Sequence, residues 1–279
     1  DEAAGPRERG EDALDAIDPA RVPPLDVQVG RLKTRNALLN DITLVTRPSS
    51  EGMTIHRLGF DNGDLRLEGQ GQWRDRPRNR TSLRMNLRGS DFGSGLSELG
   101  YGGALVGGEG KVTASLDWDG PPWSPTFGGL GGYTQLRLQD GLIPEVDPGP
   151  ARLLGLVSLR ALPQMLSLDF GNLVQRGYAF DTISGRVDFD AGNGFSRGLE
   201  VDGPAGKMII TGRTGLVARD YDQIVRFQPE LSSSLPVIGA LTGGPVTGLA
   251  VALIQGVLRN IGADVEEASE FRYSLTGTW

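Results

Sequence analysis

Apolar and polar residues alternate along most of this chain in short runs. In residues 64–73, Leu65 and Leu67 alternate with Arg66 and Glu68. Successive side chains of a β-strand point to opposite faces, so this period of two predicts strands that are buried on one face only. The same pattern recurs in residues 81–89, 111–120, 133–141, 183–192, 206–218, 222–231 and 270–279.

The runs are bounded by Gly, Asn, Asp and Pro residues, which favour turns. Glycine is unusually frequent, with 42 residues in the chain. There are about a dozen runs, and their spacing is too irregular for a propeller or a leucine-rich repeat. The pattern therefore predicts a mostly β fold, built as a long antiparallel β-meander.

Three segments interrupt the strand pattern. Residues 1–20 are polar, with at most one short helix near residues 12–17, and are expected to be a lead-in or linker. Residues 149–166 contain clustered leucines typical of a short helix, which Pro163 must end or kink. The third segment, residues 235–258, carries no charge. We expect the remainder, residues 21–279, to form one β domain.

The uncharged segment has 24 residues, formally enough to cross a membrane core that needs about 20. However, Pro236, Gly239 and the sequence Gly243-Gly244-Pro245 interrupt it. Proline favours the first position of a helix, so a helix is expected from Pro245 to Asn260. Its length would be about 24 Å, short of the ~30 Å hydrocarbon core. The sequence therefore argues against a single membrane span.

We predict instead an apolar helical hairpin over residues 235–261. Small residues spaced by four would let its two arms pack closely, namely Gly244, Gly248, Ala252 and Gly256. The apolar surface of the hairpin would come from Val237, Ile238, Leu241, Leu249, Leu253, Ile254, Val257 and Leu258. Such a surface needs an apolar neighbour. The hairpin would either cap the apolar side of the sheet or dip into a membrane, and the sequence leaves both open.

Composition argues against several classes of function. The chain has no cysteine, one histidine and a net charge of −7, so disulfides, multi-histidine metal sites and a broad nucleic-acid footprint are not expected. The stretch before Gly110 and Lys111 lacks the spacing of a phosphate-binding loop. Asp188 and Asp190 share one strand face, but solvated strand charges are far commoner than a calcium or acid/base site. We expect no catalytic residue, metal or cofactor, and hence no enzyme.

A connected series of segments resembles the C-terminal region of the YhdP family, AsmA-like and TamB-related envelope proteins of Gram-negative bacteria. The series is LQDGLIPEVDPGPARLLGLVSLRALPQMLSLDF (138–170), GYAFDTISGRVDFDAG, VDGPAGKMIITGRTGLVARDYD, LSSSLPVIGALTGGPVTGLAVALIQGVL and FRYSLTGTW. Together these segments cover about the last 140 residues. The resemblance implies a β-groove, open along one side, that carries phospholipids across the periplasm and supports the outer-membrane barrier.

The resemblance also implies partners and a longer protein. It implies an inner-membrane anchor in a preceding part of the protein, and contact with the outer membrane at the C-terminal end. An apolar sheet face would hold acyl chains, and the candidate groove residues are Leu65, Leu67, Leu83, Met85, Leu87, Leu116, Leu136, Leu138, Val187, Phe189 and Ile210. The alternative is a scaffold or assembly factor for outer-membrane proteins, without a continuous lipid groove. An outer-membrane barrel is disfavoured, because aromatic residues are only 6% and form no girdle.

Overall fold

The computed structural model describes residues 17–75, 78–144, 177–229 and 270–278. These residues form one sheet of twelve strands with short helical elements in the connections. The strands are β1 (Leu25–Lys33), β2 (Leu38–Ser49), β3 (Gly52–Asp61), β4 (Leu65–Arg74), β5 (Arg80–Gly89), β6 (Val106–Asp119), β7 (Gly131–Ile143), β8 (Tyr178–Asp190), β9 (Asn193–Gly203), β10 (Gly206–Gly215), β11 (Asp220–Pro229) and β12 (Phe271–Thr278). The helical elements are η1 (Pro19–Arg21), α2 (Phe92–Glu98) and η2 (Phe127–Gly129).

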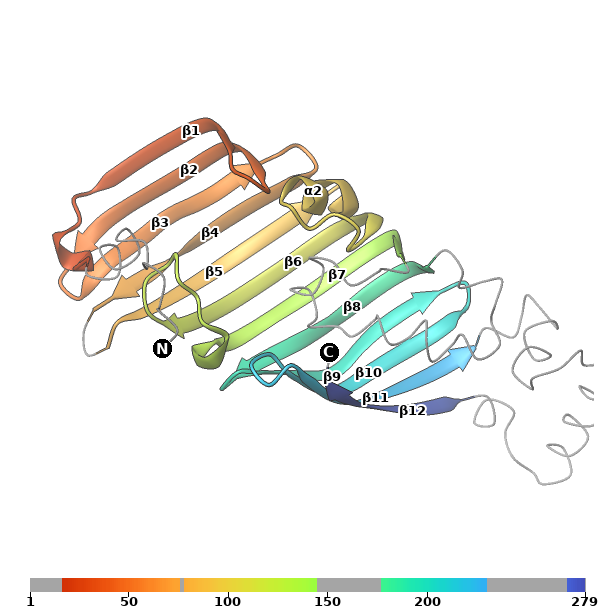
Figure 1. Cartoon of the computed structure of the whole chain (residues 1–279). Coiled ribbons are helices and arrows are strands. Elements are labelled where there is room, and N and C mark those ends of the chain that lie inside the picture. The colour runs from red at the N-terminus through yellow and green to blue at the C-terminus, as the bar shows by residue number, and fades with distance from the viewer. Residues whose placement is uncertain (1–16, 76–77, 145–176, 230–269, 279) are drawn as a thin grey trace, which may run out of the picture.

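The sheet is an antiparallel meander in which each strand pairs with the next strand along the chain. β1 and β12 lie at opposite ends, so the sheet is not closed into a barrel (Figure 1). The prediction of a mostly β antiparallel meander is therefore confirmed. None of the helices in the described ranges is both long and apolar enough to span a membrane.

The register places apolar residues of neighbouring strands on the same face. One row runs from Leu67 of β4 to Leu87 of β5, Val112 of β6 and Leu136 of β7, each residue opposite the next. The adjacent row on the reverse face contains Glu68, Asn86, Thr113 and Gln135. One face of the sheet, here called the apolar face, is thus lined by hydrophobic side chains, and the other, the polar face, by polar ones.

Two bulges keep this separation in strands whose sequence does not alternate regularly. In β3, Ile55 pairs with Gly71 and Leu58 with Gly69, so the extra residue lies at His56–Arg57 and both Ile55 and Leu58 stay on the apolar face. In β9, Leu199 pairs with Ile210 while Arg197 pairs with Thr211, which leaves Gly198 as the extra residue. Gly198 has a φ of +144°, a backbone conformation that side-chain-bearing residues rarely adopt.

Helix α2 packs on the apolar face beside β4 and β6 (Figure 1). It begins at Asp91, whose side chain accepts a 2.8 Å hydrogen bond from the Ser94 amide. Phe92 and Gly95 are buried against the sheet. The sequence pattern did not reveal this helix, because glycines disfavour helix. Here Gly95 allows close contact with Leu65, and Gly93 allows close contact with the backbone of residues 105–107.

Several sequence predictions fall on residues that the structure does not describe. The helical hairpin over residues 235–261 and the short helix over residues 149–166 lie outside the described ranges, as does most of the polar lead-in.

Replacing Gly95 by Ala tests the packing of α2 against the sheet. Alanine favours an isolated helix over glycine by about 1 kcal/mol, but here its Cβ would overlap the side chain of Leu65. We expect a net loss of about 1–3 kcal/mol in the free energy of unfolding, measured by urea denaturation. The control is Gly30→Ala on β1, where no atom lies within 4 Å of the added Cβ. An equal response of the two variants would contradict this packing.

Tyr178→Phe tests a buried hydrogen bond in the same sheet. The Tyr178 hydroxyl donates to the Gly206 carbonyl at 2.9 Å, and burial, with smaller contributions from Asp202 and Asp181, raises the pKa of this phenol. The unfolded chain loses the proton first, so this stabilisation is complete below about pH 10 and falls as the pH rises further. We expect Tyr178→Phe to lose about 1 kcal/mol near neutral pH and to depend less on pH above about 10.

Urea unfolding at neutral and alkaline pH measures both effects of the Tyr178 substitution. The matched control is Tyr101→Phe, which also removes one phenol from the chain. If the free energy of unfolding falls with pH above about 10 as steeply in Tyr178→Phe as in the wild type, the buried phenol is not the source of this pH dependence.

Candidate functional site

The apolar face is the candidate site, and it divides into a packed part and a half-buried part. Among the predicted groove residues, some are buried: Leu65, Leu83, Leu138, Val187, Phe189 and Ile210. Others are only half-buried: Leu67, Met85, Leu87, Leu116 and Leu136. The half-buried group lies on β4–β7, so this stretch presents hydrophobic surface that the protein does not fully cover.

Two further residues belong with the half-buried group but were not among the predicted groove residues. Val112 stands in register between Leu87 and Leu136, and Phe60 stands opposite Leu67. Val112 was visible in the alternation of residues 111–120. Phe60 was harder to place, because the bulge at His56–Arg57 shifts the phase of its strand.

The middle row of the half-buried surface combines three small residues with one long side chain. Gly69, Met85, Ala114 and Thr134 follow one another in register across β4–β7. A Cβ added at Gly69 would meet the Met85 side chain at 3.3 Å. The rows on either side carry leucines such as Leu87 and Leu83, and the Leu83 row also contains Gly71.

Two margins of different construction border this surface. At one end of the strands lies α2, where Phe92 packs with Leu65 in the larger hydrophobic cluster. At the other end are Trp73 and Trp118, both buried. Their indole nitrogens donate to Asn79 Oδ1 at 2.7 Å and to the Pro121 carbonyl at 2.9 Å.

The tryptophan margin combines two buried, hydrogen-bonded indoles, Trp73 and Trp118, with the exposed indole of Trp123. Trp123 packs edge-on against Trp73 with ring centroids 4.9 Å apart, yet 46% of its surface remains exposed. Amphipathic indoles suit such a border between apolar and aqueous surroundings.

From β8 onward the apolar face is filled by its own side chains. Its core residues include Tyr178, Phe180, Leu199, Val201, Met208, Ile210, Val225 and Phe227. Ile210, one of the predicted groove residues, therefore lies in a packed core. The structure thus separates residues that support the sheet from residues that offer free surface.

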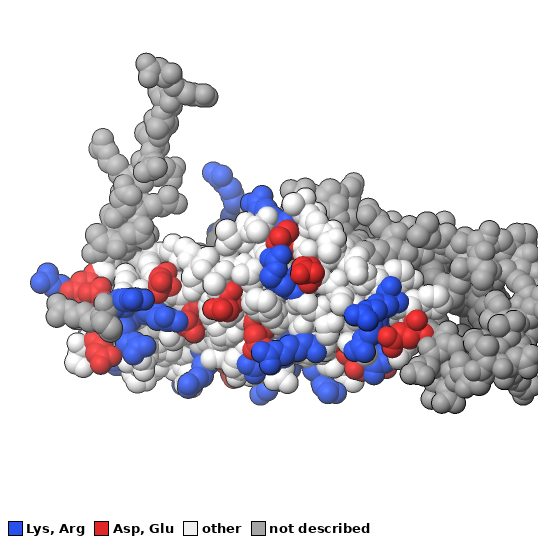
Figure 2. Space-filling model, turned by 90° about the horizontal axis from the view of Figure 1, so that it is seen from below, with Lys and Arg blue, Asp and Glu red and all other residues white. Residues whose placement is uncertain are grey.

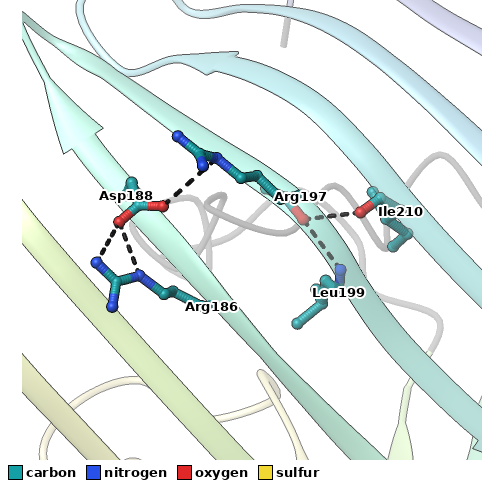
Figure 3. Close-up of polar contacts among 6 residues, drawn as sticks. Arg186, Asp188, Arg197, Leu199 and Ile210 are labelled. Atoms are coloured by element: carbon teal, nitrogen blue, oxygen red, sulfur yellow. Dashed lines mark hydrogen bonds and ion pairs between the residues drawn. The ribbon is translucent and has the colours of Figure 1, made fainter.

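Polar groups inside this packed part mostly satisfy one another. Ser196 Oγ donates to the Ile210 carbonyl at 2.7 Å and accepts from the Leu199 amide at 3.1 Å, which compensates for the ladder that the β9 bulge disrupts (Figure 3). Gln223 Nε2 donates to Thr214 Oγ1 at 2.8 Å, while Gln223 Oε1 has no hydrogen-bond partner. These groups hold the bulge and neighbouring strands in place.

The polar face carries both basic and acidic side chains, which form ion pairs such as Lys207 with Glu200. In the view of Figure 2, basic and acidic groups lie next to one another. Asp188 lies between Arg186 and Arg197, with nitrogen-to-oxygen distances of 2.6 and 3.9 Å (Figure 3). Its hydrogen bond to Arg186 lowers the pKa of the carboxyl below the usual value. Asp188 thus makes surface ion pairs.

The described residues contain no cluster of three or more His, Asp or Glu side chains that could hold a metal ion. The single histidine, His56, is exposed on the β3 bulge. What the half-buried part of the apolar face offers a ligand is mainly hydrophobic area, with few polar groups such as the Thr134 hydroxyl. That chemistry fits a long apolar ligand better than a small polar substrate.

Comparison with known proteins agrees with this picture. The family described as "YhdP protein" matches residues 3–279 of the chain. The curated Intermembrane phospholipid transporter YhdP of Escherichia coli (strain K12) is 30% identical over 240 residues, which cover 85% of this chain and 18% of the relative. The chain thus spans less than a fifth of that relative's length. No solved structure matches this chain. With the family match covering nearly its whole length, the chain belongs to the YhdP family.

Proposed function

We propose that this chain is part of a non-enzymatic conduit that carries phospholipids across the periplasm, between the inner and outer membranes. The observation that carries the proposal is the apolar face, which continues through the sheet while the reverse face is polar. Membership of a family that includes a protein named as a phospholipid transporter supports it. By supplying phospholipid, the conduit would support outer-membrane lipid homeostasis and the barrier function.

The half-buried surface of β4–β7 would hold the acyl chains. Contact between an acyl chain and Leu67, Leu87 or Leu136 removes hydrocarbon from water, at about 25 cal/mol per Å² of apolar surface. This attraction has no preferred direction, so a lipid could slide from one row of residues to the next without breaking a specific bond. The headgroup would stay in water along the open side of the sheet.

The arrangement of the strands suits a path that runs across them. Twelve strands spaced by about 4.8 Å would extend for about 50 Å, well beyond the ~30 Å core of a bilayer. In a longer protein of this family, further strands would lengthen the path. We propose that an anchor in a preceding part of the protein holds it in the inner membrane.

A scaffold role in outer-membrane protein assembly is the second candidate. The observation in its favour is the packed part of the face from β8 onward, which is filled by residues such as Met208, Val225 and Phe227. A scaffold would need no free apolar surface, whereas a conduit needs the half-buried stretch of β4–β7. Direct measurement of bound lipid distinguishes the two.

Val112→Asp with Leu136→Asp tests the lipid surface. The two residues are opposite each other on β6 and β7, and a carboxylate against an acyl chain disfavours binding by more than the 1.4 kcal/mol that corresponds to tenfold in affinity. We expect the wild-type chain, purified without detergent, to carry stoichiometric phospholipid in organic extracts analysed by mass spectrometry. The double variant should carry at least about tenfold less.

The matched control is Thr113→Asp with Gln135→Asp. These two residues are also opposite each other on β6 and β7. Each is the chain neighbour of a residue changed in the test variant, and both lie on the polar face. The control adds the same charge and should retain its lipid, provided that circular dichroism shows both variants to be folded. A wild-type chain without phospholipid would reject the conduit and favour the scaffold.

We further propose that the uncharged segment of residues 235–258 makes the contact with the outer membrane. Leu253→Asp with Ile254→Asp should then abolish binding of the chain to phospholipid vesicles, measured by co-flotation, while the fold is retained. Unfolding of this variant would instead indicate that the segment caps the apolar face.

A further inference from the structure

The polar face pairs many of its cations with carboxylates. The ion pairs on it include Arg66 with Asp61, Arg80 with Asp117, Arg186 with Asp188, Lys207 with Glu200 and Arg213 with Asp220. Such exposed pairs contribute little to stability individually. They do, however, leave little uncompensated positive charge at those positions.

Three adjacent strands depart from this arrangement. Arg88 of β5 is opposite Lys111 of β6, and Lys111 is opposite Arg137 of β7. All three side chains are exposed. No acidic group in the described part of the chain forms an ion pair with any of them. We call these residues the cationic row.

The neighbours of the cationic row on the same face are one paired arginine, three neutral residues and two glutamates. On β4 the row continues to Arg66, whose charge is already paired with Asp61. The next row along the strands, here called the neutral row, has Asn86, Thr113 and Gln135 in register on β5–β7, and on β4 it ends in Glu68. Like charges directly opposite each other destabilise a sheet. A chain with a net charge of −7 thus keeps three cations side by side on this face. Glu68 and Glu109 lie nearby on the same face, but neither forms an ion pair with the cationic row.

We propose that the cationic row binds an acidic helical segment of a partner protein. The spacing favours a helix over an extended segment. Neighbouring cations are separated by the distance between strands, about 4.8 Å. Carboxylates at positions i and i+4 of a helix are separated by about 6.0 Å along its axis, whereas those on one face of an extended segment are about 6.7 Å apart. Over three residues the helix drifts from the cations by about 2.4 Å and the extended segment by about 3.8 Å, so the helix fits the row better.

The neutral row would complete this binding surface. Asn86, Thr113 and Gln135 lie beside the cations on the same face and can donate or accept hydrogen bonds at the edge of the bound helix. Bound this way, the helix would run across the strands on the face opposite the half-buried apolar surface. The partner and an apolar ligand could therefore occupy the same strands at once. The inference does not depend on the proposed lipid transport.

A binding experiment with a defined probe tests the proposal. The probe is a fluorescent, alanine-rich helical peptide with glutamates at positions i, i+4 and i+8, and binding is followed by anisotropy at low salt. The test variant is Arg88→Gln, Lys111→Gln and Arg137→Gln. We expect it to bind the peptide at least about tenfold more weakly than the wild type and with a smaller salt dependence.

Two controls distinguish specific binding by the cationic row from general electrostatic attraction. Arg66→Gln, Arg186→Gln and Arg213→Gln remove the same number of cations from the same face, at paired positions, and should retain most of the affinity. A peptide of the same composition with its glutamates on different helix faces should bind weakly. Equal losses in the two protein variants, or equal binding of the two peptides, would overturn the proposal.

Vesicles of anionic phospholipid provide the competing outcome. If the test variant loses vesicle binding while peptide binding is unchanged, the row contacts a lipid surface and the proposal fails. Stability gives an independent readout, because removing one of three adjacent like charges should relieve repulsion. We expect Lys111→Thr to raise the Tm by about 1–3 °C at low salt, and not at high salt. A lower Tm would show that the row serves the fold instead.

Discussion

Strand register is the constraint on which the rest of the structure depends. Each strand pairs only with its neighbours in sequence, and each pairing must place hydrophobic residues on the same face. A slip of one residue would exchange the two faces of a strand and bring polar side chains into the row of Leu67, Leu87 and Leu136. The bulges at His56–Arg57 and at Gly198 are part of this constraint, because they restore the phase where the sequence departs from strict alternation.

The same constraint gives the sheet two independent surfaces. Val112 and Thr113 are neighbours in the chain, yet one belongs to the apolar face and the other to the polar face. Side chains on opposite faces do not touch, so substitutions on one face leave the chemistry of the other largely intact. A sheet exposed on both sides can therefore hold a ligand and a protein partner over the same strands. In a globular domain with one buried core, one face of the sheet is covered, so only the other face can bind a partner.

The faces of regular strands were predictable from the sequence, because a period of two needs no knowledge of tertiary structure. Leu65, Leu83 and Leu116 were placed correctly on one side of their strands. Strand β9 was not among the runs identified by alternation, since its bulge puts Ser196 on the apolar face and Phe195 on the polar face. Helix α2 was missed because its glycines reflect contacts with the sheet and not helix propensity.

The degree of burial was beyond the reach of the sequence. Leu136 and Leu138 are both apolar and share a face, yet only Leu138 is fully buried, since burial depends on the elements packed over each end of the strands. The cationic row was equally hidden, because Arg88, Lys111 and Arg137 are distant in sequence and meet only through register. A pattern within one strand does not contain the alignment between strands.

The meander has a consequence for how such a protein is made. Every strand finds its partner in the segment just before or just after it, so the long-range closure that slows many β proteins is largely avoided. Each new strand can add to the edge left by the previous one while synthesis continues. The energetics then resemble those of a linear array, in which length grows without a change in cross-section. The growing edge also remains open to a wrong strand until the next hairpin forms, which makes the rate of chain delivery important for correct assembly.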